Sequence, residues 1–136
     1  MAGAPLELLG DVPLFSELGE ADLEQVARLF KRRHFSAGET VTKEGSGGAA
    51  FFLIESGTAA VTVKGRERPA MGPGAHFGEV ALIDGRERSA TITATSDLVC
   101  YGLTYWDFQP LVRTNAAIAW GLLQSMTRLL RVAQED

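Results

Sequence analysis

The stretch Gly72–Thr91 reads GPGAHFGEVALIDGRERSAT and sets the expectations for the rest of the chain. Within it, Gly78 and Glu79 open a run of four apolar residues, 80–83, that ends at a turn signal. Four residues are too few for an independent helix, but they suit one helical turn whose first N–H groups have no backbone partner. The amino end of such a turn favours an anion, so the stretch predicts an anion-binding turn over residues 78–81.

Three polar side chains in this stretch indicate which kind of anion would bind. Arg88 offers a planar fork of donors that suits two oxygens of a phosphate, and Ser89 adds a hydroxyl beside it. A phosphate would repel the carboxylate of Glu79, so this group needs another partner, and a sugar hydroxyl is a suitable donor. Together the three residues predict a compact ligand in which a phosphate is joined to a ribose.

The same residues carry a resemblance to a known family. Phe77-Gly78-Glu79, a few apolar residues, a turn and then Arg88-Ser89-Ala90 resemble the phosphate-binding cassette of the cyclic-nucleotide-binding domain family. The resemblance implies a cyclic nucleotide as the ligand, and a serine at position 89 favours cAMP over cGMP. The residues that it implies for phosphate and ribose binding are Gly78, Glu79, Val80, Ala81, Arg88, Ser89 and Ala90.

Composition and charge are those of one ordinary globular domain. The chain has 136 residues, of which 46% are hydrophobic and 22% charged, and this length supports a sizeable core. The net charge of -4 argues against a nucleic-acid surface, and no apolar run approaches the roughly 18 residues of a membrane span. Because the N-terminus has no secretory pattern, we expect a cytoplasmic protein. The single cysteine, Cys100, lies in an apolar segment typical of a buried strand.

The pattern along the chain predicts an α+β fold that is mainly β, in a single domain over residues 1–136. Residues 1–30 are expected to form an N-terminal helical segment and 105–136 two C-terminal helices, with Asn115 capping the second. Residues 31–104, which contain the cassette 72–91, are expected to form short strands separated by glycines. The clearest strands are expected at 34–35, 39–43, 50–55, 58–64, 89–95 and 98–103. Strands at this spacing favour a sandwich or a jelly roll, and the resemblance implies an eight-stranded jelly-roll-like barrel with a short phosphate-binding helix.

The residues that contact the base are expected on strand 58–64 and in the segment between this strand and the cassette. Val61 lies on the inward side of the alternating strand 58–64, so it is a candidate wall residue. Arg68 and Met71, which immediately precede the cassette, are further candidates.

The lid over the base is expected on the last helix. Through its Met126-x-Arg128 turn, this helix resembles that of the bacterial transcription activators of the family, whose base-contacting positions fall at Ala133 and Gln134. Ala133 has no polar group, and a guanidinium of Arg128 or Arg131 can stack on a purine instead. An apolar stripe on the same helix suits packing on the barrel or a homodimer seam, and both remain open.

Other classes of function compete with a sensor. A metal-dependent cupin enzyme needs clustered histidines, but His34 and His76 lie on different segments. A nucleotide hydrolase needs paired carboxylates or a metal site, and Glu79 with Asp84 is a poor pair. The stronger rival is a degenerate domain that keeps the fold as an interaction or dimerisation module.

The sequence therefore leads to the hypothesis of a regulatory cyclic-nucleotide sensor. It binds cAMP, with cGMP as second candidate, and repositions its terminal helices to control an attached or separate effector whose identity stays open. No catalytic residue, metal, cofactor, nucleic acid or membrane segment is expected.

Overall fold

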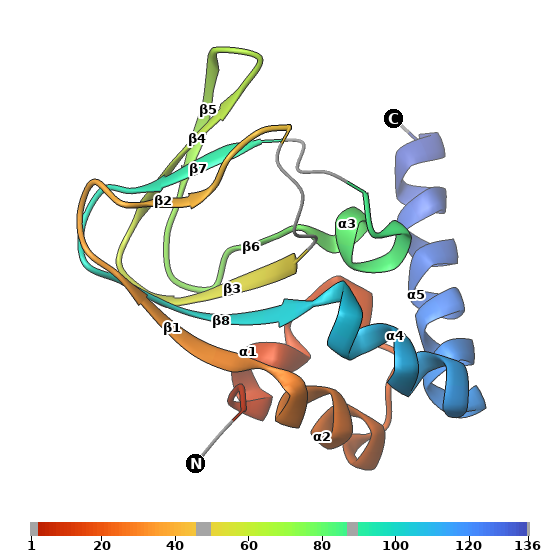
Figure 1. Ribbon diagram of the computed structural model, residues 1–136. Helices are drawn as coiled ribbons and strands as arrows, with labels where there is room; N and C mark the ends of the chain where they lie inside the picture. Colours follow the sequence, from red (N-terminus) through yellow and green to blue (C-terminus); the bar gives the residue numbers. More distant parts are fainter. Residues whose placement is uncertain (1–2, 46–49, 87–89, 136) are drawn as a thin grey trace.

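The computed structural model describes residues 3–45, 50–86 and 90–135 (Figure 1). Within these ranges the helices are α1 (Leu6–Gly10), the 3-10 turn η1 (Pro13–Phe15), α2 (Glu20–Leu29), α3 (Glu79–Asp84), α4 (Tyr105–Thr114) and α5 (Ala116–Glu135). The strands are β1 (Lys31–Phe35), β2 (Thr40–Thr42), β3 (Ala50–Ser56), β4 (Ala59–Val63), β5 (Arg66–Met71), β6 (His76–Phe77), β7 (Thr91–Ala94) and β8 (Leu98–Thr104).

The eight strands of the described ranges form two antiparallel sheets. One sheet has the order β1-β8-β3-β6 and the other the order β2-β7-β4-β5. The sheets face each other, and the helices lie on one side of the first sheet and at its end (Figure 1). The expected fold class, mainly β with a jelly-roll-like barrel and helices at both ends of the chain, is confirmed.

Strand β3 separates two hydrophobic cores. Phe51 and Leu53 belong to the cluster that the helices cover, whereas Phe52 and Ile54 belong to the cluster between the sheets. Since successive side chains of a strand point to opposite faces, a strand buried on both faces needs an uninterrupted apolar run. This explains why residues 50–54 are all apolar and all buried.

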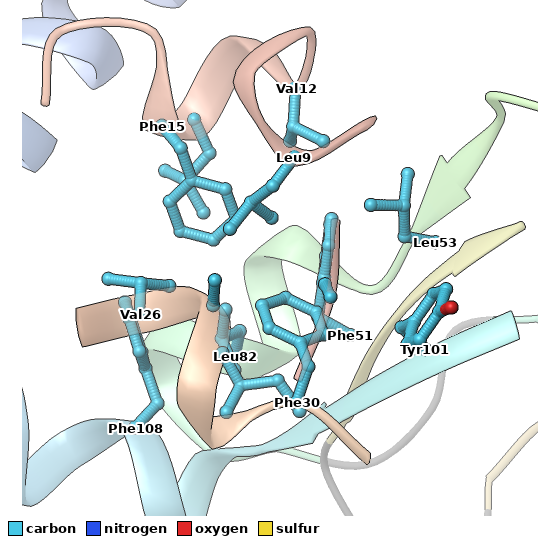
Figure 2. Packing of buried hydrophobic residues seen from close by; sticks show 14 of the residues in the cluster. Leu9, Val12, Phe15, Val26, Phe30, Phe51, Leu53, Leu82, Tyr101 and Phe108 are labelled. Carbon is cyan, nitrogen blue, oxygen red and sulfur yellow. The ribbon is translucent and has the colours of Figure 1, made fainter. Parts of the chain in front are cut away.

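An aromatic cluster joins the helices to the first sheet (Figure 2). The ring of Phe15 from η1 meets three other rings edge to face, with centroids at 6.4 Å for Phe30, 5.8 Å for Phe51 and 6.2 Å for Phe108. Such pairs each add about 0.5–1.5 kcal/mol beyond their burial. The cluster thus links η1, the end of α2, strand β3 and α4 into one core.

The helix predictions hold with small shifts at the ends. Helix α5 begins where expected, because the Oδ1 atom of Asn115 accepts a hydrogen bond from the N–H group of Ile118 at 3.0 Å. Helix α3 is the short helix expected after Gly78. Among the helices of residues 3–45, 50–86 and 90–135, none is long and apolar enough to cross a membrane.

Two strands have no counterpart among the six that the sequence indicated most clearly. Strand β5, with the sequence RERPAM, is an edge strand, and its first five residues are exposed. Charged residues and Pro69 suit an edge, where one side of the backbone needs no partner, but they hide the strand from a hydrophobic pattern. Lys64 and Gly65, with φ of 53° and 75°, form the two-residue turn from β4 into β5. Strand β6 has only two residues, too few to show a period.

Candidate functional site

A cavity of about 570 Å³ lies between the second sheet, β6 and α3. This volume falls within the range of small-molecule sites. Its wall is formed by Thr42, Val61, Met71, His76, Phe77, Gly78, Glu79, Val80, Ala81, Asp84, Arg86, Ala90 and Ile92. The structure therefore brings the predicted turn 78–81, Ala90 and two of the predicted base-wall residues to one cavity.

Gly78 lines the cavity at the start of α3. It has a left-handed conformation with φ of 98°, and its carbonyl accepts the first hydrogen bond of α3, from Leu82 at 3.0 Å. The N–H groups of residues 79–81 come before that bond, so the helix itself gives them no acceptor. Leu82 is buried in the core under the helices and fixes the turn from below, while residues 78–81 face the cavity.

Glu79 carries the carboxylate of this wall. Its side chain is 34% exposed, and Oε2 lies 3.1 Å from Nδ1 of His76. Burial alone would raise the pKa of Glu79, but the hydrogen bond and charge of His76, together with the backbone of Glu79, hold it below its usual value. The site therefore contains an ionised carboxylate at neutral pH.

His76 connects the cavity to the core under the helices. Its ring packs on Phe51 with centroids 5.8 Å apart and an angle of 30° between the planes. The Nδ1 atom is buried, and the Oε2 atom of Glu79 at 3.1 Å is the polar group that it contacts. Among the described residues, no group of three His, Cys, Asp or Glu side chains is placed to hold a metal ion.

The base-wall candidates divide into two groups. Val61 and Met71 line the cavity, and Ile92, the partner of Val61 in the ladder, extends the same apolar wall. Arg68 lies opposite Val61 on the other side, but it is exposed on the edge strand β5 and does not line the cavity. One wall of the cavity is therefore apolar and suits a flat ring.

Arg88 and Ser89 lie outside the described residues, but the nearest described residues on both sides of them line the cavity. Arg86 and Ala90, on either side, both line the cavity. The hydroxyl of Thr42 donates to the carbonyl of Ala90 at 3.1 Å, which fixes the returning chain to β2.

The arrangement identifies the family of the chain. The family model described as "Cyclic nucleotide-binding domain" matches residues 32–115. The chain belongs to the cyclic nucleotide-binding domain family. The family is one of regulatory domains that bind cyclic nucleotides.

The domain is similar to parts of longer proteins. It is 36% identical over 113 residues to a cyclic nucleotide-gated potassium channel of Mesorhizobium japonicum, covering 83% of this chain and 31% of the channel. It is 38% identical over 106 residues to a cAMP-dependent protein kinase regulatory subunit of Yarrowia lipolytica, covering 76% of this chain and 28% of the subunit. The chain thus spans about a third of the length of these two relatives.

A solved structure supports the fold. The N-terminal domain of a transcriptional regulator from Streptomyces coelicolor superimposes with a TM-score of 0.83 at 26% identity, covering 94% of this chain and 95% of that one.

The candidate lid residues of this cyclic nucleotide-binding domain lie elsewhere. Arg128 forms an ion pair with Glu17, and together with Trp120 and Arg131 these residues line a separate groove along α5. Gln134 is exposed near the end of the helix. None of the three lid candidates, Arg128, Arg131 and Gln134, lines the cavity, so the lid stays a prediction.

Sequence reasoning missed several residues of the wall. The sequence singled out His76 only as a possible metal ligand and did not single out Arg86, which is exposed and borders the cavity. Thr42 and Ile92 come from β2 and β7, which reach the cavity only through the sheet pairing. Of these, only His76 had a signal in the sequence, since it stands three residues before Glu79 in the cassette.

Proposed function

We propose that this domain is a regulatory sensor that binds cAMP, with cGMP as the second candidate. The observation that carries the proposal is the single cavity that combines an ionised Glu79, the turn 78–81 and an apolar wall, in a chain of the cyclic nucleotide-binding domain family. A nucleotide needs all three features, since its phosphate, ribose and base differ in polarity.

The phosphate is assigned to the cassette. Arg88 and Ser89 supply side-chain donors, and the N–H groups of residues 79–81 supply backbone donors, next to Ala90. The assignment of Arg88 and Ser89 rests on the sequence pattern. It is supported by the position of Arg86 and Ala90 on the cavity wall. The serine at position 89 is our reason for placing cAMP before cGMP.

We assign the ribose and the base to the other residues that line the cavity. Glu79 accepts a hydrogen bond from the ribose 2′-hydroxyl, for which an ionised carboxylate is a strong acceptor. The base lies against Val61 and Met71, with Arg68 at the edge beyond Val61.

The lid requires movement of the terminal helices. For Arg128, Arg131 or Gln134 to cover the base, α5 has to move and the ion pair of Arg128 with Glu17 has to break. Binding can drive this step only if the ligand has a higher affinity for the closed arrangement. Such a movement would pass the signal to an effector, attached or separate.

The exposed apolar side of α5 suggests a second copy of the chain as a partner. Trp120, Leu123 and Leu130 are 63%, 55% and 61% exposed. A helix with such a face either packs against another element or associates with a copy of itself. Sedimentation velocity tests this homodimer: Leu130→Glu should shift a dimer towards monomer, and a wild-type chain that stays monomeric at high concentration would exclude it.

Calorimetric titration with cAMP, cGMP and 5′-AMP tests the proposed function. We expect cyclic nucleotide binding at micromolar or lower concentration and none of 5′-AMP. Arg88→Ala removes charged hydrogen bonds that contribute about 1.5–3 kcal/mol each, so affinity should fall by well over tenfold. Arg66→Ala, on the exposed hairpin, is the matched control and should bind like wild type. Absence of binding in the wild type would instead favour an interaction module without nucleotide.

A further inference from the structure

Among the described residues, one ion pair lies in the cavity wall, and it joins His76 to Glu79. Nδ1 of His76 lies 3.1 Å from Oε2 of Glu79, and both residues line the cavity. The Nδ1 atom is buried and has no aligned hydrogen-bond partner elsewhere among the described residues. The ring cannot easily turn away, because it packs on Phe51 at 5.8 Å. His76 is therefore held against the carboxylate that the proposed function assigns to the ribose.

The contact leaves part of the carboxylate for a ligand. A carboxylate has two oxygens and about four lone-pair positions; Nδ1 of His76 lies against Oε2, and the backbone of Glu79 also donates to the carboxylate. The imidazole can therefore orient Glu79 while a remaining lone pair accepts from a hydroxyl. An unprotonated ring leaves the negative charge of Glu79 uncompensated, whereas a protonated ring forms an ion pair that offsets it.

Charged groups line the cavity with His76 or lie on the strand that pairs with its own. On α3 and just after it, Glu79, Asp84 and Arg86 line the same cavity. On the neighbouring strand β3, the carboxylate of Glu55 accepts a hydrogen bond from the Tyr101 hydroxyl of β8 at 2.8 Å. Carboxylates ordinarily titrate below about pH 5, and tyrosine and arginine at about pH 10 or above. Imidazole is the group among these types that ordinarily changes charge between pH 5 and 8.

We propose that His76 is a positioning residue for Glu79 and that its protonated form strengthens cyclic-nucleotide binding, so that the affinity of the domain depends on pH near neutrality. This inference rests on the proposed function. The ligand carries one negative charge on its phosphate, and an uncompensated Glu79 repels it. A protonated imidazole held 3.1 Å from Glu79 offsets this repulsion, so the affinity should rise towards acidic pH. Removal of such a repulsion in a partly exposed site corresponds to an increase in affinity of roughly threefold to tenfold.

Calorimetric titration of the whole chain with cAMP from pH 5.5 to 8.5 tests this inference, in buffers of different ionisation enthalpy. We expect tighter binding by about threefold to tenfold at the acidic end, together with net proton uptake on binding between these limits. Proton uptake is measured on the wild type and needs no variant. A merely structural role of His76 would produce neither effect.

Two variants separate positioning from charge. His76→Phe keeps a ring on Phe51 but removes Nδ1, and His76→Asn keeps a neutral amide near that position. Both should lose the pH dependence, and His76→Asn should bind more tightly than His76→Phe at pH 8.5. His34→Asn, which removes the other histidine on the exposed strand β1, should keep the wild-type pH profile.

The outcomes are distinct from those for the proposed function. Binding that does not change with pH, or a pH profile that survives in His76→Phe, would overturn the role of His76 and leave the cyclic-nucleotide site intact. Absence of cAMP binding at every pH would overturn both the proposed function and this inference.

Discussion

Gly78 lies so close to strand β3 that any side chain there would overlap the carbonyl oxygen of Ala50. Its φ of 98° is in the region that residues with a Cβ atom avoid. The close contact fixes the start of α3 on β3, and Glu79 follows immediately. The glycine of the cassette therefore has a structural reason that does not depend on a ligand.

Replacement of this glycine should destabilise the domain. Gly78→Ala combines the strain of a positive φ with a backbone collision, and we expect a loss of unfolding free energy of about 2–4 kcal/mol. Gly38→Ala is the matched control, since Gly38 has φ of 93° with no atom within 4 Å of an added Cβ, and it should lose only about 1 kcal/mol. Urea unfolding of both variants measures the difference. Equal losses would show that the contact with Ala50 is unimportant.

The sequence predicted the parts of the site that depend on local spacing. The Gly78-Glu79 start, the short helix and the Asn115 cap each need only a few neighbouring residues, and each is found in the structure. Val61 was placed correctly on the inner face because β4 alternates. The sequence was sufficient to predict an element wherever its apolar residues recur at the spacing of a helix or a strand.

The parts that were missed depend on pairing between distant segments. Thr42 reaches the cavity because β2 pairs with β7, and no spacing in the sequence encodes that contact. The role of His76 follows from the packing of its ring on Phe51, which is 25 positions away along the chain. Strand β5 gave no hydrophobic signal because its first five residues are exposed.

Glu79 can be tested against the ribose hydroxyl directly. Glu79→Gln replaces a charged acceptor by a neutral one, and we expect about a tenfold loss of cAMP affinity. For the wild type, 2′-deoxy-cAMP should show a similar loss, and for the variant it should show little further loss, because the same hydrogen bond is already weakened. Isothermal titration of the four combinations gives the coupling energy.

Asp84→Asn is the control for Glu79→Gln, because it also removes a negative charge from α3 at the cavity wall. Its affinity for cAMP should stay equal to that of the wild type or rise slightly. Independent, additive losses for Glu79→Gln and 2′-deoxy-cAMP would argue that the ribose hydroxyl binds another group.

Cys100 should reduce the stability of the domain at alkaline pH. Burial raises the pKa of its thiol from 9.0 to about 11, although the charge of Arg33 acts in the opposite direction. In the unfolded chain the thiol loses its proton near pH 9, whereas in the folded chain it keeps it up to about pH 11. The unfolded state therefore binds fewer protons in this window, and the free energy of unfolding falls as the pH rises from 9 to 11. Below pH 9 the contribution of the thiol is fully present.

Urea unfolding between pH 7 and 10.5 measures this slope, with Cys100→Ala as the comparison. The variant should be less stable at pH 7, since it leaves a small cavity in a core position, but its stability should fall less steeply above pH 9. Some slope should remain, because burial and the hydrogen bond to Glu55 also raise the pKa of Tyr101. Equal slopes above pH 9 for the wild type and the variant would mean that the thiol ionises as readily in the folded domain as in the unfolded chain, which a side chain with 0% exposure should not do.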